Sequence, residues 1–259
     1  MIRLIQRYFT YTLFIVTLIS SSRALSFEYN LYGSIQPEYS IFINGDGRHN
    51  QSREKPSILG TTNFTTFIQD DNAKISISVL GRYDRKDHNR SYFDFQKLKY
   101  EYYLDNATLK LGNEIVFWGV NESFHLVDII NQSNLAENLS GTKKLGQPMI
   151  AVSLYKDFGD LDFYILPYFR EQIYPGANGR PRLILEIDEN SISYESSKAD
   201  KHTDFAIRYS TMIDDFDIGI SHFYGNSRNP VLSINESNFK LDQYYSLLSH
   251  TGMDIQATK

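Results

Sequence analysis

The stretch that decides the fold reads ATLKLGNEIVFWGVNESFHLVDIIN and spans residues 107–131. Two sets of side chains alternate along its first half: Ala107, Leu109, Leu111, Ile115 and Phe117 on one side, and Thr108, Lys110, Gly112, Glu114 and Trp118 on the other. A period of two predicts a β-strand. A strand needs roughly 9–11 tilted residues to cross a bilayer, so this one is long enough to place an apolar side against lipid and a charged side in water. The alternation stops after Trp118-Gly119, where we expect a long loop that folds into a barrel lumen.

The composition fits strand-rich structure and excludes some partners. The chain has 259 residues, 41% of them hydrophobic, with 19 Tyr and 17 Phe against a single Trp. Such aromatic content suits the girdles of a membrane barrel, and it equally suits a soluble all-β protein. A net charge of -5, without a basic stripe, argues against nucleic acid as a partner. With 0 Cys, neither a disulfide framework nor a thiolate metal site is available.

The first residues have the pattern of a secretory signal peptide. Arg3 and Arg7 precede an apolar run from Leu13 to Ile19, and small residues lead to Ala24. We therefore predict a signal peptide over residues 1–24 and one barrel domain over residues 25–259. After Ala24 no apolar run approaches the roughly 20 residues of a spanning helix. An exported chain of this kind would have to cross a membrane with strands.

About ten segments of the chain are predicted as strands from their alternation. They cover residues 27–43, 58–69, 74–83, 97–104, 107–118, 149–156, 160–170, 204–213, 216–220 and 250–257. Within the seventh of them Pro167 removes one ladder hydrogen bond, so we expect a bulge there. Several further charged residues fall on the predicted lumen faces: Lys97, Lys99 and Glu101.

The connections between these strands alternate in length. Tight turns at Asp70, Asp105, Asp157 and Asp214 separate long polar connections. Outer-membrane barrels show this asymmetry because short turns face the periplasm and long loops face the outside, whereas a soluble sandwich has no reason to keep it. The sequence thus predicts an all-β, antiparallel transmembrane β-barrel. Because a barrel must pair its last strand with its first, and no terminal aromatic is present, we expect this chain to be an N-terminal part of a larger barrel.

The central stretch resembles a family of large porin-like outer-membrane β-barrel proteins of Gram-negative bacteria, most of them uncharacterised. Their pattern Gly-x-x-x-x-x-Trp-Gly followed by Asp-x-x-Asn matches Gly112, Trp118, Gly119, Asp128 and Asn131. Ser227-Arg228-Asn229-Pro230 and the segment 250–256 are similar to two further motifs. The family usually has proline after the Asn, where this chain has Gln132. The resemblance covers the second half of the chain and implies an outer-membrane location, with no assigned substrate.

The candidate site is the predicted pore. The residues expected to line or constrict it are Lys110, Glu114, Trp118, Glu122, His125, Asp128, Asn131, Arg170 and Arg208. Loop 119–148 would narrow the lumen, set its charge preference and pack its apolar residues as a small plug. Trp118 has two placements open to it, the barrel rim at the membrane interface or a packed position in the wall.

The predicted function is passive diffusion of small solutes through an outer-membrane channel. We expect no enzyme, because neither a Gly-x-Ser-x-Gly elbow nor a phosphate loop is present. The six His residues lack metal-ligand spacing, so neither a metal nor another cofactor is expected. The expected partners are outer-membrane lipid, small solutes and the barrel-assembly machinery, and a homo-oligomer remains open. Two alternatives stay open as well: a barrel hydrolase active at its outer mouth, and a structural or adhesive barrel whose long loops bind other molecules.

Overall fold

The computed structural model describes residues 28–43, 52–68, 72–119 and 127–257. Its strands are β1 (Tyr29–Ile41), β2 (Glu54–Ile68), β3 (Ala73–Asp84), β4 (Tyr92–Leu104), β5 (Ala107–Glu114), β6 (Gln147–Lys156), β7 (Gly159–Leu166), β8 (Ile187–Tyr194), β9 (Asp204–Ile213), β10 (Phe216–Asn226), β11 (Val231–Asn235), β12 (Lys240–Tyr245) and β13 (Leu247–Ala257). A short 3-10 helix, η1, covers Ala199–Lys201. Over these residues, no helix is long and apolar enough to span a membrane. The predicted signal peptide lies outside the described residues.

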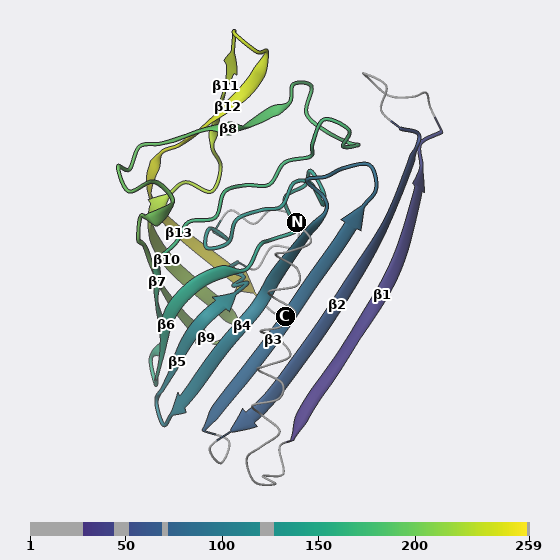
Figure 1. The fold of residues 1–259 in the computed structure, drawn as a ribbon. Coiled ribbons are helices and arrows are strands. Elements are labelled where there is room, and N and C mark those ends of the chain that lie inside the picture. The colour runs from purple at the N-terminus through teal and green to yellow at the C-terminus, as the bar shows by residue number, and fades with distance from the viewer. Residues whose placement is uncertain (1–27, 44–51, 69–71, 120–126, 258–259) are drawn as a thin grey trace.

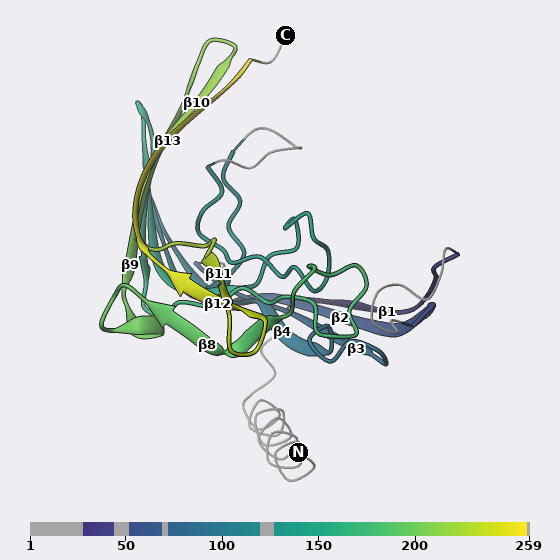
Figure 2. The ribbon, with the colours of Figure 1, turned by 90° about the horizontal axis from the view of Figure 1, so that it is seen from above.

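Ten of the strands form one sheet in the order β1-β2-β3-β4-β5-β6-β7-β9-β10-β13 (Figure 1). Every neighbouring pair is antiparallel, and β1 with β2 keeps its register over the whole of β1, from Tyr29 opposite Thr66 to Ile41 opposite Glu54. Seen from above in Figure 2, the sheet curves like part of a barrel wall around a concave side. The predicted all-β, antiparallel, barrel-like fold with about ten strands is therefore confirmed.

The two faces of this sheet differ in polarity. On the convex face, Ile35 of β1, Phe205 of β9 and Ile255 of β13 are 76%, 50% and 52% exposed. On the concave face, which we call the inner face, the register places Lys74 of β3 opposite Glu101 of β4, and Glu101 opposite Lys110 of β5. Strand alternation explains both faces, because successive side chains point to opposite sides.

The connections alternate in length as predicted. Short connections join β2 to β3, β4 to β5, β6 to β7 and β9 to β10, and Asp105-Asn106 and Asp214-Asp215 form turns in two of them. The longer connections lie at the other end of the sheet (Figure 1). Two of these, which the sequence analysis treated as loops, contain strands. β8 pairs in parallel with β12, and β12 pairs antiparallel with β11, as a separate small sheet.

Several strand ends differ from the prediction, and two of them bear on the candidate site. The central strand was expected to continue through Trp118, but β5 ends at Glu114. Its partner β6 begins at Gln147, directly opposite Glu114, so no residue of β6 is available to pair with residues after Glu114. The seventh predicted strand was expected to bulge at Pro167 and continue to Arg170. Instead β7 ends at Leu166, since proline has no N–H for the ladder. Arg170 consequently lies in a connection and not on a strand.

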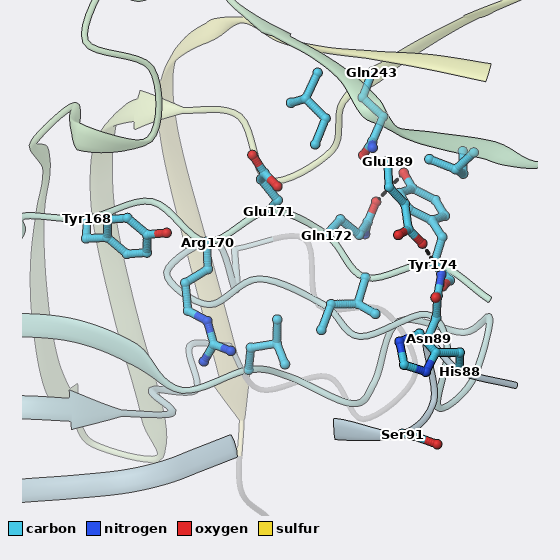
Figure 3. A pocket seen from close by; sticks show the side chains of 14 residues that line it. His88, Asn89, Ser91, Tyr168, Arg170, Glu171, Gln172, Tyr174, Glu189 and Gln243 are labelled. Carbon is cyan, nitrogen blue, oxygen red and sulfur yellow. Dashed lines mark hydrogen bonds between the residues drawn. The ribbon is translucent and has the colours of Figure 1, made fainter. Parts of the chain in front are cut away.

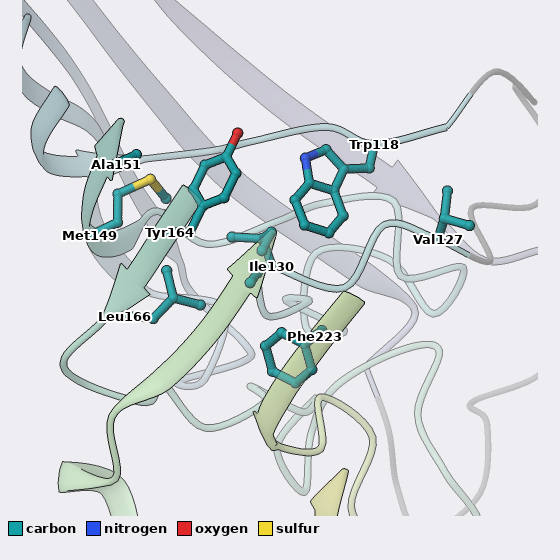
Figure 4. Close-up of a cluster of buried hydrophobic side chains, with 9 residues drawn as sticks. Trp118, Val127, Ile130, Met149, Ala151, Tyr164, Leu166 and Phe223 are labelled. Carbon is teal, nitrogen blue, oxygen red and sulfur yellow. The ribbon is translucent and has the colours of Figure 1, made fainter. Parts of the chain in front are cut away.

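The buried apolar cluster lies on the inner face, between the sheet and the β5–β6 connection (residues 115–146) (Figure 4). The inner face supplies Met149, Ala151, Tyr164, Leu166, Ala206 and Phe223. The connection supplies Trp118, Val127 and Ile130. Burying these side chains removes apolar surface from water, so the connection is held against the inner face.

Candidate functional site

The candidate constriction is the part of the β5–β6 connection that the structure describes, residues 115–119 and 127–146, together with the inner face against which it packs. Figure 2 shows residues 127–146 on the concave side of the sheet. The connection leaves β5 through Gly119, whose φ of +110° is a conformation that side chains rarely adopt. Glu122 and His125, two predicted lining residues, lie outside the described residues.

Lys99, on the inner face of β4, forms ion pairs with two glutamates. Its Nζ lies 2.5 Å from Oε1 of Glu114 and 2.8 Å from Oε1 of Glu101. Lys110 is opposite Glu101 in the register of β4 and β5. The predicted lining residues Lys110 and Glu114 therefore both lie on the inner face of β5, with Gly112 between them, and Glu114 forms an ion pair with Lys99.

Trp118 packs against the wall. Its side chain is 3% exposed, and its ring meets that of Tyr164 edge-on with 5.6 Å between the ring centroids (Figure 4). The Arg208 guanidinium lies 5.7 Å from the Trp118 ring, within cation–π range. Arg208 also makes two hydrogen bonds of 2.8 Å to Asp254 of β13. Of the two placements left open for Trp118, the structure shows the packed one, with Arg208 beside it.

Asn131 joins the two ends of the connection. It is fully buried, and its Oδ1 accepts a hydrogen bond of 2.8 Å from the Val116 backbone N–H. Its Nδ2 donates to the backbone oxygens of Glu114 at 2.8 Å and Leu145 at 2.9 Å. A buried backbone group without a partner costs free energy, so one amide stabilises three groups at once. The Asp-x-x-Asn motif thus has a structural basis in this chain.

The other acid of that motif forms an ion pair within the connection. Oδ2 of Asp128 lies 3.5 Å from Nζ of Lys144, and both side chains are largely buried. The pair links the start of the segment 127–146 to its end. Asp128 therefore contributes to the shape of the connection.

Glu137 fixes the middle of the connection to the wall, and the sequence analysis did not single it out. Its Oε1 is 2.6 Å from Nε of Arg82, and its Oε2 is 3.7 Å from Nη2 of Arg90. Arg82 in turn pairs with Glu38 of β1 at 2.6 Å. Arg82 belongs to a segment that was predicted as a strand, but no local pattern identifies a partner so far along the chain.

Arg228, in the motif Ser227-Arg228-Asn229-Pro230, links the β10–β13 connection to the β5–β6 connection and to β9. Its Nη1 donates to Oδ2 of Asp204 at 2.8 Å, and its Nε donates to the Ile130 oxygen at 3.0 Å. The guanidinium lies 5.2 Å from the centroid of the Phe169 ring and 4.9 Å from that of Phe223. Burial lowers the pKa of Arg228, and the Asp204 charge opposes that shift.

Arg170 reaches the same region from the β7–β9 connection. Its Nη1 lies 2.6 Å from Oδ1 of Asp94 and donates to the Gly146 oxygen at 2.7 Å. Arg170 also borders a cavity of about 510 Å³ near the long connections (Figure 3). Ion pairs and hydrogen bonds hold the side chains of this region in place, and the cavity beside them has the volume of a small-molecule site. Within the described ranges, His, Asp and Glu side chains nowhere gather in a group of three or more that would hold a metal.

Taken together, the fold is a barrel-like antiparallel sheet with an apolar outside, a polar inside and a segment folded inward. No family model matches the sequence, and no curated protein matches it. Among solved structures, the chain is similar to the porin OprB of Pseudomonas putida, in a structure determined at high pH, with 10% identity and a TM-score of 0.41. The match covers 88% of this chain and 60% of OprB. The chain therefore spans less than two thirds of the length of that porin.

Proposed function

We propose that the protein is a porin-like outer-membrane channel through which small solutes diffuse passively. In this proposal the convex face contacts lipid, the inner face lines a water-filled lumen, and the β5–β6 connection narrows it. The chain is exported by its signal peptide and inserted with the help of the barrel-assembly machinery. No catalytic step is assigned to it.

The observation that carries the proposal is the inverted polarity of the sheet. Soluble monomers rarely expose contiguous apolar patches larger than a few hundred Å², whereas here the exposed apolar side chains extend from Tyr29 of β1 to Ile255 of β13. The inner face instead carries buried ion pairs such as Lys99 with Glu101. An apolar outside and a polar inside suit a wall between lipid and water.

The inward connection supports a constriction. Asn131, Glu137 and Arg228 attach it at three separate places to its own ends, to β3 and to the β10–β13 connection. A segment held this firmly reduces the open cross-section by a constant amount. Its apolar side chains pack on the wall, and Glu137 pairs with Arg82 of the wall.

The proposal also requires a closed wall. In the described sheet β1 pairs only with β2, and β13 pairs only with β10, so two edges have unpaired backbone groups. Hydrocarbon offers no hydrogen bonds to such edges. We propose that further strands join β1 to β13 and complete the barrel.

Planar-bilayer recording of the full-length protein tests the function. Discrete current steps are expected after insertion, with a conductance that rises when the connection is released from the wall. Protein that inserts into the bilayer, as judged by protease protection, but gives no steps above background would contradict the channel. Neutral-solute swelling of liposomes provides a second readout that does not depend on ionic current.

A further inference from the structure

The cavity of about 510 Å³ lies between parts of the chain that are distant in sequence. Figure 3 shows Arg170, Glu171 and Gln172 on one side, His88 and Asn89 on another, and Glu189 and Gln243 from the small sheet. A volume of this size is typical of sites for small organic molecules. It is built from connections and from β8 and β12, outside the large sheet.

The cavity has an excess of negative charge. Its one arginine, Arg170, is already paired with Asp94 at 2.6 Å and donates to the Gly146 oxygen. Glu171 instead accepts a hydrogen bond of 2.5 Å from the Tyr194 hydroxyl, and Glu189 accepts one from the Asn89 amide. Both of these donors are neutral, so they orient the carboxylates without cancelling their charge.

The Tyr194 hydroxyl keeps its proton at neutral pH. Burial and the hydrogen bond to Glu171 both raise the pKa of Tyr194. Tyr194 is therefore a donor to Glu171 over the whole physiological range and does not become a second anion. The two carboxylates, Glu171 and Glu189, are exposed at the cavity and remain accessible to a ligand.

The same cavity has an apolar component. Leu145, Ile173, Ile187 and Ile192 line it, and the rings of Tyr168 and Tyr174 border it. Apolar walls favour the hydrocarbon body of a ligand, and tyrosine rings attract cations through their faces. Burial raises the pKa of Tyr174 to about 12, so this ring also stays neutral.

We propose that this cavity binds an organic cation, a primary ammonium group attached to an apolar or aromatic body. The ammonium group is attracted by Glu171 and Glu189, and the body packs on Ile173 and Ile192. A carboxylate ligand of the same shape is repelled. The assignment of such amines as solutes of the channel rests on the proposed function, whereas the binding itself does not.

Calorimetric titration of the full-length protein in detergent with phenethylamine tests the site, and 2-phenylethanol serves as its uncharged analogue. Glu171→Gln and Glu189→Gln keep an oxygen for Tyr194 and Asn89 but remove the charge. We expect the amine to bind about tenfold or more tightly than the alcohol, and the double variant to abolish that preference, because charge-assisted hydrogen bonds are roughly twice as strong as neutral ones. Asp215→Asn, which removes one carboxylate charge in the β9–β10 turn as each single variant does, is the control and should leave binding unchanged.

Equal binding of the amine and the alcohol, or an amine affinity that the double variant leaves unchanged, would overturn the proposal. Loss of the preference in Asp215→Asn as well would also overturn it, since a general charge effect would then explain the result. The two proposals fail separately. A protein that conducts ions but shows no charge-dependent amine binding retains the channel and loses the site, and the reverse result retains the site and loses the channel.

Discussion

Arg82 of β3 and Glu137 of the β5–β6 connection form an ion pair with 2.6 Å between Nε and Oε1, and their side chains are only 4% and 7% exposed. The same guanidinium pairs with Glu38 of β1. One arginine thus links the first strand, the third strand and the inward connection. Because removing one partner of a buried pair leaves the other charge uncompensated, this contact is costly to break.

We predict that Glu137→Gln lowers the free energy of unfolding by about 1–3 kcal/mol, less than for a fully isolated pair because Glu38 still faces Arg82. Urea unfolding in lipid vesicles measures the change. Glu186→Gln is the control, because its pair with Lys240 is exposed and 3.6 Å long. That variant should cost at most about 1 kcal/mol. Equal losses in the two variants would show that the buried pair has no special role.

The sequence was sufficient for the strands of the wall and their two faces. Alternation is a local property, so segments such as 74–83 and 107–114 can be recognised as strands without knowing which strands they pair with. The alternating lengths of the connections can also be predicted from the sequence, because tight turns are recognisable at Asp105 and Asp214. These features together define the fold class.

The small sheet, and the contacts that attach the β5–β6 connection to the wall, could not be predicted from the sequence. β8 reads IDENSISY, which has few apolar residues, and its partner β12 lies far along the chain. The pairs of Glu137 with Arg82 and of Arg228 with Asp204 likewise join distant segments. Asn131 stood in a recognisable motif, but its role depends on three backbone groups that only tertiary structure brings together.

Asn131→Ala should release the connection from its own ends. The substitution removes three hydrogen bonds and leaves the Val116 N–H and the carbonyls of Glu114 and Leu145 to find other partners. We expect a loss of at least about 2 kcal/mol, since each unsatisfied buried group costs about 1–3 kcal/mol. Hydrogen exchange of residues 127–146 should accelerate, and single-channel conductance should change. Asn190→Ala, at an exposed position of β8, should do neither.

Asn131→Asp distinguishes hydrogen bonding from packing at the same position. Aspartate has nearly the same shape as asparagine, but its carboxylate cannot donate to the two carbonyl oxygens. The variant should therefore destabilise the connection at least as much as Asn131→Ala. A stability close to that of the wild type would mean that the side chain acts only by filling space.

Arg228→Lys should weaken the contact between the β10–β13 connection and the constriction. Lysine keeps the charge, but it lacks the planar fork with which Arg228 donates hydrogen bonds to Asp204 and the Ile130 oxygen and contacts the rings of two phenylalanines. We expect a loss of about 1–3 kcal/mol by urea unfolding, because a buried hydrogen bond to a charged group is lost. Arg85→Lys, at an exposed position, is the control. An unchanged midpoint for Arg228→Lys would contradict the role given to the guanidinium geometry.

Asp87 gives the β3–β4 connection a predictable pH response. Burial raises the pKa of Asp87 above its ordinary value of 3.8, even though its Oδ1 accepts 3.1 Å hydrogen bonds from the backbone N–H groups of Asn89 and Gly176. A carboxyl with a raised pKa binds its proton more tightly in the folded state than in the unfolded state. Its contribution to stability therefore grows as the pH falls through the raised pKa, and its ionisation destabilises the fold above that pH.

Asp87→Asn should accordingly stabilise the protein near neutral pH, because asparagine keeps the accepting oxygen without the buried charge. The advantage should shrink as the pH falls towards 3.8, where the wild-type carboxyl becomes protonated in both states. Urea midpoints of the two proteins, compared from neutral to acidic pH, measure it, with Asp215→Asn as an exposed control. A variant that is less stable than the wild type near neutral pH would show that the charged carboxylate, through its bonds to Asn89 and Gly176, outweighs the cost of its burial.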